Sequence, residues 1–294
     1  MQITKEDYQL FKPLLFSLGY RLLGSVAEAE DLVQETFLKA YQIDGENINN
    51  KKAYLCKIMT NHCLDVLKSA RYKREQYVGP WNPEPLLLEK IHAFDPSEIV
   101  IQKEGLSMAY LRMMEHLAPD ERAILLLREV FDFPYSEIAN IIEKKEENCR
   151  KIFSRAKQKL TLVEDESLHY EKNKSLVNRF IEAFQTQNRD ALLELISENV
   201  TLYSDGGGKV TAAVRPVVSV SNVLALLYGV IKKAPKDSYF EVKNVNYQPA
   251  IVVYMNGKIQ SILSFYIHHE KIIEMYITMN PDKLPVHDRA GTDN

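Results

Sequence analysis

The spacing of apolar residues changes once along this chain, near residue 170, and this change limits the folds open to it. Up to about residue 160, apolar residues recur every three to four positions, the period of helices buried along one side. Later segments such as "AIVVYM" and "IQSILSFYIH" cluster β-branched and aromatic residues, as strands do. The 294 residues exceed one typical core. We therefore expect a multidomain chain that is all-α first and α+β last.

The C-terminal part is expected to begin with two helices in "NKSLVNRFIEAFQTQNRDALLELISENV" and to continue as a curved antiparallel sheet. Further strands are expected at "TLYSD", "KVTAAVRPVVSV", "YFEVKNVNY" and "IIEMYITM". Asn256-Gly257 is a strong signal for a two-residue hairpin. Aromatic residues of this part either line a ligand pocket or simply form its core. They are Phe180, Phe184, Tyr228, Phe240, Tyr254 and Phe265.

Prolines mark a long break in the helical part. The stretch 76–97 contains Pro80, Pro83, Pro85 and Pro96, so it cannot form a continuous helix. Its Trp81 and the leucines at 86–88 indicate that this linker docks on another part of the chain. We expect two helical domains, at residues 1–76 and 98–165, joined by a linker at residues 77–97. An α+β domain at residues 172–284 and a tail at residues 285–294 follow.

The second helical domain carries the spacing of a helix-turn-helix. "PYSEIANII", a short "EKK" turn and "EENCRKIFSRAKQKL" predict two helices in that arrangement. The net charge is only −3, but residues 144–159 hold seven basic side chains against two acidic ones. An ordinary α-hairpin with a solvated basic helix is the alternative, and turn spacing together with charge favours DNA binding. The side chains suited to phosphates and base edges are Arg150, Lys151, Ser154, Arg155 and Lys157.

A second basic segment, residues 51–75, has seven basic side chains against two acidic ones. Its expected helix presents amides, a carboxylate and cations together, as surfaces that capture an unstacked nucleic-acid strand do. These side chains are Asn61, Asp65, Lys68 and Arg71. The helix before it places Asp31, Gln34 and Glu35 on one acidic and polar face, away from its apolar stripe.

Several other functions find little support. Cys56 and Cys63 are about 10.5 Å apart on one expected helix, at ~1.5 Å per residue, which is too far for a disulfide. With Cys149 they form no metal motif, so neither a metal nor another cofactor is expected. The N-terminus lacks a signal-peptide pattern and no apolar stretch approaches 18 residues. We expect a cytoplasmic protein without membrane contact.

The stretch "DGGGK", residues 205–209, looks at first like a phosphate-binding loop. A Walker loop requires GxxxxGK followed by Ser or Thr, whereas Val210 follows Lys209 and the flanks are strand-like. Nucleotide hydrolysis is therefore rejected. Gly206, Gly207 and Gly208 instead permit a sharp connection and a close approach by another backbone.

General-base catalysis in the C-terminal domain is also disfavoured. The candidates are Asp205, His268 and His269, but Asp205 adjoins the glycines and the histidines fall in an expected hairpin turn beside Glu270. We therefore expect no enzymatic activity.

Three segments together resemble the extracytoplasmic-function (ECF) sigma factors of bacterial RNA polymerase. They are "YRLLGSVAEAEDLVQETFLKAY", "AYLCKIMTNHCLDVLKSARYKREQYVGPWNPEPL" and "LAPDERAILLLREVFDFPYSEIANIIEKKEENCRKIFSRAKQKL". From residue 174 onward, with "DGGGKV" and "NPDKL", the chain resembles the SnoaL-like extension of the SigJ-like subgroup, a cone-shaped, NTF2-like α+β domain. The resemblance covers nearly the whole chain. It implies a subunit that binds core RNA polymerase and directs promoter-specific initiation.

The resemblance also implies roles for single residues. Asp31, Gln34 and Glu35 match the surface for the coiled coil of the largest polymerase subunit. Asn61, Asp65, Lys68 and Arg71 match the helix that melts and reads the −10 element, and "DGENINN" matches the loop that receives a flipped base. Asn148, Arg150, Lys151 and Arg155 match the recognition helix for the −35 element. The chain departs at Lys145, where a helix-capping serine is usual, and at Asn82, where an apolar residue is commoner.

Two hypotheses follow for the whole chain. In the first, a sigma factor is regulated by its fused C-terminal domain. In the second, a one-component helix-turn-helix regulator carries a ligand-binding or enzymatic domain, which would leave residues 51–75 and the acidic face without a purpose. For the first, we expect the loop Asp205–Lys209 to touch the linker around Trp81 and Pro83, or the adjoining helical domain. Such intramolecular contacts would help set whether the two DNA-reading domains are held closed or free.

Overall fold

The computed structural model describes residues 3–42, 50–74, 77–88, 106–160 and 169–285, with the side chains of residues 70–74 excepted. The chain divides into two compact units. The first contains residues 1–76, 92–106 and 110–164, and the second contains residues 77–91, 107–109 and 165–294. The proline-rich linker thus belongs, in its described part, to the same unit as the C-terminal domain.

The first unit is all-α, as expected. Its helices are α1 (Lys5–Leu23), α2 (Val26–Tyr41), α3 (Lys51–Arg74), α6 (Pro119–Glu129), α7 (Tyr135–Ile142) and α8 (Glu146–Leu160), together with most of α5 (Met108–Met114). Thr4 and Asp7 form a capping box at the start of α1, and Gly24 ends that helix in the left-handed conformation with φ 69°. Ser25 then caps α2 through its side chain. Local sequence signals therefore fix the α1–α2 corner.

One hydrophobic core runs through α1, α2, α3, α6, α7 and α8. The apolar stripe expected on α2 is confirmed, since Leu32, Val33 and Phe37 are buried. Arg122 of α6 is 3% exposed and donates to the backbone carbonyl of Leu22 and to Glu115. Burial lowers the pKa of Arg122 to about 10, so this side chain remains a cation at neutral pH. A buried cation thus joins the end of α1 to α6.

The helix-turn-helix is formed by α7 and α8. Helix α7 ends at Ile142 and is followed by its capping residue Glu143, which has φ 57°, and α8 begins at Glu146. A glycine would adopt this left-handed conformation more easily. Ile138, Ile141 and Cys149 are buried between the helices and the rest of the unit.

The second unit holds an α+β domain. Helices α9 (Tyr170–Gln185), α10 (Arg189–Leu195) and α11 (Val220–Lys232) accompany a six-stranded sheet of order β2-β1-β6-β5-β4-β3, and η3 (Pro281–Lys283) follows it. The strands are β1 (Ile196–Asp205), β2 (Val217–Val218), β3 (Tyr239–Val245), β4 (Gln248–Met255), β5 (Lys258–His268) and β6 (Lys271–Thr278). Asn256 and Gly257 turn between β4 and β5 with φ 52° and 72°, which confirms the predicted hairpin.

Two expectations for this sheet were wrong. First, β1 pairs with β6 in parallel, so the sheet is mixed rather than antiparallel. The hairpins from β3 to β6 bring the last strand back beside the first, where both run in the same direction. Second, the strand expected at "KVTAAVRPVVSV" shrinks to β2, because Pro216 cannot donate to a ladder, and α11 follows at once. Ser219 caps α11 by accepting from the N–H of Asn222.

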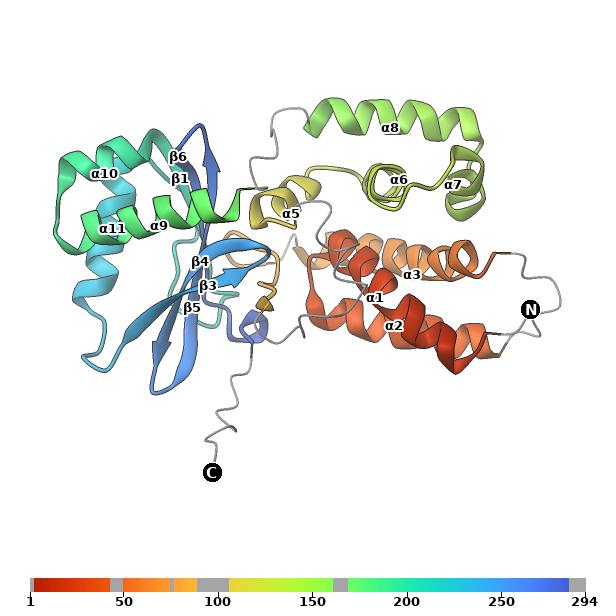
Figure 1. The fold of residues 1–294 in the computed structure, drawn as a ribbon, viewed down its shortest axis with the longest axis horizontal. Coiled ribbons are helices and arrows are strands. Elements are labelled where there is room, and N and C mark those ends of the chain that lie inside the picture. The colour runs from red at the N-terminus through yellow and green to blue at the C-terminus, as the bar shows by residue number, and fades with distance from the viewer. Residues whose placement is uncertain (1–2, 43–49, 75–76, 89–105, 161–168, 286–294) are drawn as a thin grey trace. The chain divides into compact units, whose positions relative to one another are not determined.

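The two faces of the sheet are covered differently. Ile251, Leu263 and Ile277 pair across β4, β5 and β6 and pack with apolar side chains of α9, α10 and α11. Figure 1 shows these helices beside the sheet. On the opposite face, Val252 and Ile262 pack in a cluster with Leu87 of the linker. Leu87 also forms an isolated bridge with Val245. The linker therefore covers part of the sheet face that the helices leave open.

Candidate functional site

The acidic face of α2 is exposed. Asp31, Gln34 and Glu35 all face solvent, and the opposite side of α2 is buried in the core. Glu35 Oε2 lies 3.3 Å from Nδ1 of His62 on α3. Leu38 extends this face and is 62% exposed, a feature that the sequence analysis did not single out. The face combines negative charge with an apolar side chain, as protein-binding surfaces often do.

The strand-capturing surface expected on α3 is only partly described. Asn61 is half-buried, and Asp65 and Lys68 are exposed and form an ion pair at 3.2 Å. The Arg71 side chain lies outside the described residues. Most of the loop "DGENINN" also lies outside them. Of its asparagines, Asn50 is described, and its Oδ1 accepts from the N–H of Ala53 in the first turn of α3.

The predicted recognition residues on α8, Asn148, Arg150, Lys151 and Arg155, are all exposed. Buried Cys149 and Ala156 mark the opposite side of the helix. Arg150 pairs with Glu146 at 2.5 Å and Lys151 with Glu147 at 2.6 Å, both one turn earlier. The basic helix is therefore presented to solvent along its polar side.

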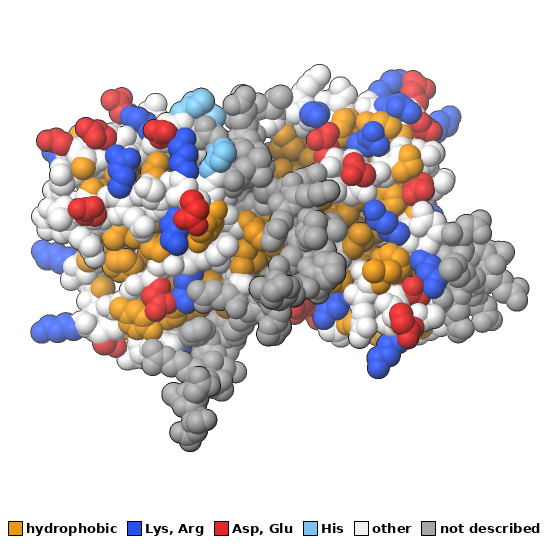
Figure 2. Space-filling model, viewed as in Figure 1, with side chains coloured by type: hydrophobic (Ala, Val, Ile, Leu, Met, Phe, Trp, Pro, Cys, Tyr) orange, Lys and Arg blue, Asp and Glu red, His pale blue; other side chains and the backbone are white. Residues whose placement is uncertain are grey.

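Other cations near α8 are also paired. Lys144 lies 3.0 Å from Asp120, Lys157 lies 3.0 Å from Glu129, and Lys159 lies 2.7 Å from Glu121. In Figure 2, basic side chains over this helix are interspersed with acidic ones. Exposed pairs of this kind contribute little to stability. A phosphate can therefore replace a carboxylate partner at low cost.

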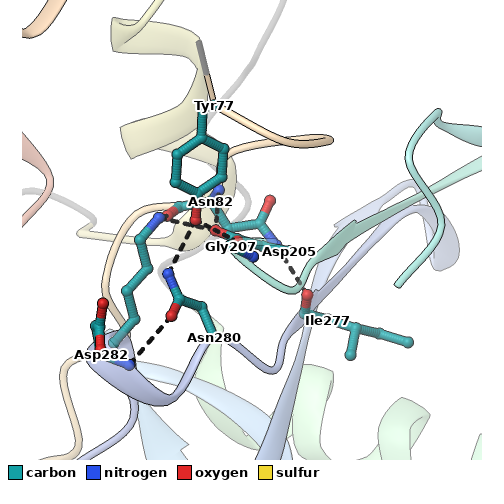
Figure 3. Close-up of polar contacts among 8 residues, drawn as sticks. Tyr77, Asn82, Asp205, Gly207, Ile277, Asn280 and Asp282 are labelled. Atoms are coloured by element: carbon teal, nitrogen blue, oxygen red, sulfur yellow. Dashed lines mark hydrogen bonds and ion pairs between the residues drawn. The ribbon is translucent and has the colours of Figure 1, made fainter. Parts of the chain in front are cut away.

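A buried polar cluster in the second unit centres on the carboxylate of Asp205, which is 0% exposed (Figure 3). Its Oδ1 accepts from the Tyr77 hydroxyl at 2.6 Å and from the Gly207 N–H at 3.1 Å. Its Oδ2 accepts from the Asn82 N–H and from Lys283 Nζ, both at 2.8 Å. Two of these four donors come from the linker, so the carboxylate joins the linker to the end of β1.

Further bonds tie the same linker residues to the end of the sheet. The Asn82 side chain donates to the Ile277 carbonyl at 3.1 Å, and the Asn82 carbonyl accepts from Lys283 Nζ at 2.6 Å. Asn280 donates to the Tyr77 hydroxyl at 3.0 Å. Burial, and then the hydrogen bond to Asp205, raise the pKa of Tyr77, which keeps this hydroxyl protonated as a donor.

Trp81 and Lys283 complete the cluster. Lys283 Nζ lies 4.1 Å from the centre of the Trp81 ring and 5.0 Å from that of Tyr77. An ammonium over aromatic faces is attracted by their quadrupoles. Asn82 itself is 0% exposed and makes polar contacts through both its backbone and its amide. An apolar residue is commoner at this position, and here the polar side chain of Asn82 is accommodated by a hydrogen bond. Pro83 beside it is buried.

Gly208 of the glycine loop lies against the linker, and Gly207 lies against Asn280 of the C-terminal domain. Gly208 has φ 71°, and a Cβ there would lie 3.3 Å from the Val78 side chain. Gly207 has φ 60°, and a Cβ there would lie 2.4 Å from the Asn280 amide. Lys209 pairs with Asp282 at 2.5 Å and makes no polar contact with the described part of the linker, residues 77–88. The cation that reaches the linker is Lys283.

The sequence analysis missed Tyr77, Asn280 and Lys283 as members of this cluster. The only signal for two of them was the motif "NPDKL", which was noted for its resemblance and given no role. Hydrogen bonds thus join the linker to the C-terminal domain, whereas a contact between that domain and the helical domains stays a prediction.

The candidate pocket aromatics do not line one site. Phe180, Phe184, Tyr228 and Phe265 pack together, with ring centres 4.4 to 5.8 Å apart between neighbours. Tyr254 lies on the opposite face of the sheet and stacks on Tyr239 at 4.9 Å, and Phe240 is 41% exposed. A pocket formed by all six residues is therefore wrong, because alternate strand residues point to opposite faces.

The two histidine candidates lie at the end of β5, and the three cysteines lie in the first unit. His269 lies in the turn after β5, as predicted, whereas His268 is the last residue of that strand, and their rings are 3.9 Å apart. Cys56, Cys63 and Cys149 are free and buried. Within the described ranges, no group of three or more His, Cys, Asp or Glu side chains is arranged to hold a metal ion. Nor does any helix in those ranges have the length and apolar character needed to span a membrane.

Known proteins match both units. Residues 8–72 match the family model "Sigma-70 region 2", and residues 107–160 match "Sigma-70, region 4". The ECF RNA polymerase sigma factor SigJ of Mycobacterium tuberculosis is 30% identical over 233 residues, which are 77% of this chain and 73% of that protein. The probable ECF RNA polymerase sigma factor SigI of the same organism is 27% identical over 282 residues, covering 94% and 93%.

The crystal structure of the M. tuberculosis sigma factor SigJ also matches, with a TM-score of 0.77 and 25% sequence identity. The match covers 97% of this chain and 100% of that one, so it includes the C-terminal α+β domain as well as the helical regions. On this evidence the chain belongs to the extracytoplasmic-function family of RNA polymerase sigma factors.

Proposed function

We propose that this sigma factor binds core RNA polymerase through α2, reads the −10 element with α3 and the −35 element with α8, and is controlled by its C-terminal domain through the linker. The observation that carries this proposal is the presence, on one chain, of both sigma regions and a linker hydrogen-bonded to a separate domain. A one-component regulator would need region 4 alone.

The charges on α8 support promoter binding. Arg150 and Lys151 are exposed and held by carboxylates only one turn away, so DNA phosphates can take the place of those carboxylates. Asn148 and Arg155 share the exposed side of the helix and can reach base edges. Binding through these residues should weaken steeply with salt, because each phosphate contact releases counterions.

The polar side of α3 supports capture of the melted −10 strand. Asn61 offers an amide for a base edge, and Lys68 offers a cation for a phosphate once it leaves Asp65. We assign Arg71 the same role as Lys68 on the strength of its position in the sequence alone.

The acidic face of α2 suits a basic or polar partner surface. Asp31, Gln34 and Glu35 point away from the core and leave their side chains available. We assign them to the contact with the polymerase, and Leu38 adds apolar area to the same face. As a polymerase subunit, the protein would act in the cytoplasm.

Control through the linker follows from where the linker is held. Tyr77, Asn82 and Leu87 are fixed on the C-terminal domain, and Met108 and Ala109, beyond the linker, pack with Tyr276 of the same domain. The chain that joins region 2 to region 4 is therefore anchored near both ends. Because two promoter elements must be reached together, this anchoring would limit how far the two regions can part.

Packing within the first unit supports such a closed state. Lys52 of α3 donates to the Phe131 carbonyl at 3.3 Å, and Lys57 of α3 lies 3.2 Å from Glu143 in the helix-turn-helix. Regions 2 and 4 thus share one core in the free protein. Engaging separated −10 and −35 elements would require these contacts to open. The C-terminal domain would then have a regulatory rather than a catalytic role.

The test is reconstitution with core RNA polymerase. Promoters would be recovered from a pool of random duplexes, and run-off transcripts measured with wild-type protein and with Asp31→Ala. We expect specific initiation with the wild type and a lower affinity for core with Asp31→Ala, while Glu30→Ala beside it serves as a control for general charge. Binding to duplex DNA without any binding to core would instead favour the one-component regulator.

A further inference from the structure

Tyr135, the first residue of α7, gathers three side chains of the helix-turn-helix region around its ring. The guanidinium carbon of Arg150 lies 4.4 Å from the ring centre, and that of Arg128 lies 5.1 Å from it. Phe153 of α8 meets the ring edge-on, with ring centres 5.9 Å apart. Neither Tyr135 nor Arg128 belongs to the set of residues assigned above to promoter reading.

The surroundings hold this ring and its neighbours in place. Arg128 donates to the Phe133 carbonyl at 3.0 Å, which anchors its guanidinium beside the ring. Phe153 supports the ring from α8, one turn after Arg150. The Arg150 side chain is itself 59% exposed, so its position depends on the contacts at its tip.

Two contacts hold the Arg150 guanidinium, and they differ in whether they leave its N–H donors free. The ion pair with Glu146 uses guanidinium N–H groups as donors, so it must be given up when those donors turn to DNA. A guanidinium over an aromatic ring uses its π-face instead, and its N–H groups stay available in its plane. The contact with Tyr135 can therefore persist while Arg150 binds DNA.

We infer that Tyr135 is a positioning residue for Arg150: its ring holds the guanidinium over the surface of the helix-turn-helix, so that the in-plane donors can pass from Glu146 to the promoter. A long arginine side chain loses much rotamer freedom on binding, and a guanidinium already held loses less. This inference rests on the proposed reading of the −35 element by α8.

The test uses holoenzyme, reconstituted from core RNA polymerase and the full chain, and measures its affinity for a promoter duplex recovered with wild-type holoenzyme. Tyr135→Phe keeps the ring, whereas Tyr135→Leu and Tyr135→Met remove it at similar volume. We expect Phe to match the wild type and both aliphatic variants to bind about three- to tenfold more weakly, in line with a cation–π contact. In an Arg150→Ala background, the aliphatic variants should cause no further loss.

Each other outcome overturns the inference. If Tyr135→Phe binds as weakly as Tyr135→Leu, the hydroxyl contacts DNA and the ring does not position Arg150. If the loss persists in the Arg150→Ala background, Tyr135 acts through the fold. If the aliphatic variants bind normally, the contact has no role. Arg155→Ala separates this inference from the proposed function. If Arg155→Ala weakens promoter binding, α8 reads the promoter whatever the role of Tyr135. If neither Arg155→Ala nor Arg150→Ala weakens binding, the proposed function fails too.

Discussion

The cluster around Asp205 and the basic surface of α8 both place cations next to carboxylates, yet they differ in burial and in the number of polar contacts that hold each pair. Asp205 is 0% exposed and accepts four hydrogen bonds, and its cation partner, Lys283, is 11% exposed. On α8, Arg150 and Lys151 are 59% and 65% exposed, and each makes a single ion pair to the preceding turn.

The difference decides whether an ion pair keeps its partners or can exchange one of them for DNA. Removing one member of a buried, hydrogen-bonded ion pair leaves the others without water or partners, so the pair is costly to open. An exposed pair is screened and contributes little, so a new partner can displace the old one. The first arrangement suits a device that keeps the linker in place, and the second suits a surface that must bind DNA and release it.

The largest effect should come from Asp205→Ala. Its four donors would lose their shared acceptor, and Lys283 would become a buried cation without its carboxylate, at a cost of about 3–5 kcal/mol in the free energy of unfolding. Urea unfolding followed by tryptophan fluorescence checks this, because Trp81 is the only tryptophan. Asp282→Ala, which removes an exposed carboxylate, is the matched control. A loss below ~1 kcal/mol for Asp205→Ala would mean that the cluster does not hold the linker.

A smaller loss is expected from Gly207→Ala. The added Cβ would lie 2.4 Å from the Asn280 amide, at a backbone φ of 60° that L side chains rarely adopt. We predict a loss of about 1–3 kcal/mol in the same unfolding measurement. Gly229→Ala is the control, since a Cβ there meets nothing within 4 Å and lies inside α11, where alanine favours the helix. Equal stability of the two variants would remove the steric explanation.

On the exposed basic surface of α8, Arg155→Ala should leave the free energy of unfolding unchanged and should weaken binding to promoter DNA. Among the residues that the structure describes, Arg155 forms no ion pair, and its Nε donates to the Lys151 carbonyl at 3.4 Å. We expect holoenzyme affinity for its promoter to fall by about tenfold, with a salt dependence reduced by about one phosphate contact. An unchanged salt dependence would place Arg155 away from the DNA.

The smallest effect should be that of Lys209→Ala. Lys209 and Asp282 are 53% and 61% exposed, so their ion pair contributes at most ~1 kcal/mol and is weakened by salt. Unfolding at low and high salt checks this. A loss similar to that of Asp205→Ala would show that the comparison between buried and exposed pairs is wrong here.

Much of the fold followed from local signals in the sequence. The stripe at Leu32, Val33 and Phe37 predicted the buried side of α2, and Asn256-Gly257 predicted the β4–β5 hairpin. The parallel pairing of β1 with β6 did not follow, because it depends on how a whole series of hairpins returns along the sheet. Helix α11 was missed since the β-branched residues before it were taken for a longer strand.

The candidate site was predictable only on its exposed side. Charge and spacing on α8 pointed to the residues that face solvent. The buried cluster joins residues far apart in the chain, such as Tyr77, Asp205 and Lys283, and no local pattern reports such a contact. The glycines were expected to let another backbone approach, but the linker neighbour of Gly208 is the Val78 side chain. The lysine that bonds Asp205 is Lys283, whereas Lys209 pairs with Asp282.

Control of transcription by the held linker is the central claim, and one measurement tests it most directly. Tyr77→Phe combined with Asn82→Ala removes the Tyr77 hydroxyl and the Asn82 side-chain amide from the linker side, and leaves Asp205 with Lys283, Gly207 and the backbone N–H of residue 82. Run-off transcription by reconstituted holoenzyme would be compared between this variant, Lys209→Ala and the wild type, with core affinity measured in parallel. We predict a several-fold change in transcript yield for the linker variant alone, at unchanged core affinity. Equal yields from all three proteins, with the Trp81 fluorescence of the variant showing a released linker, would contradict the claim.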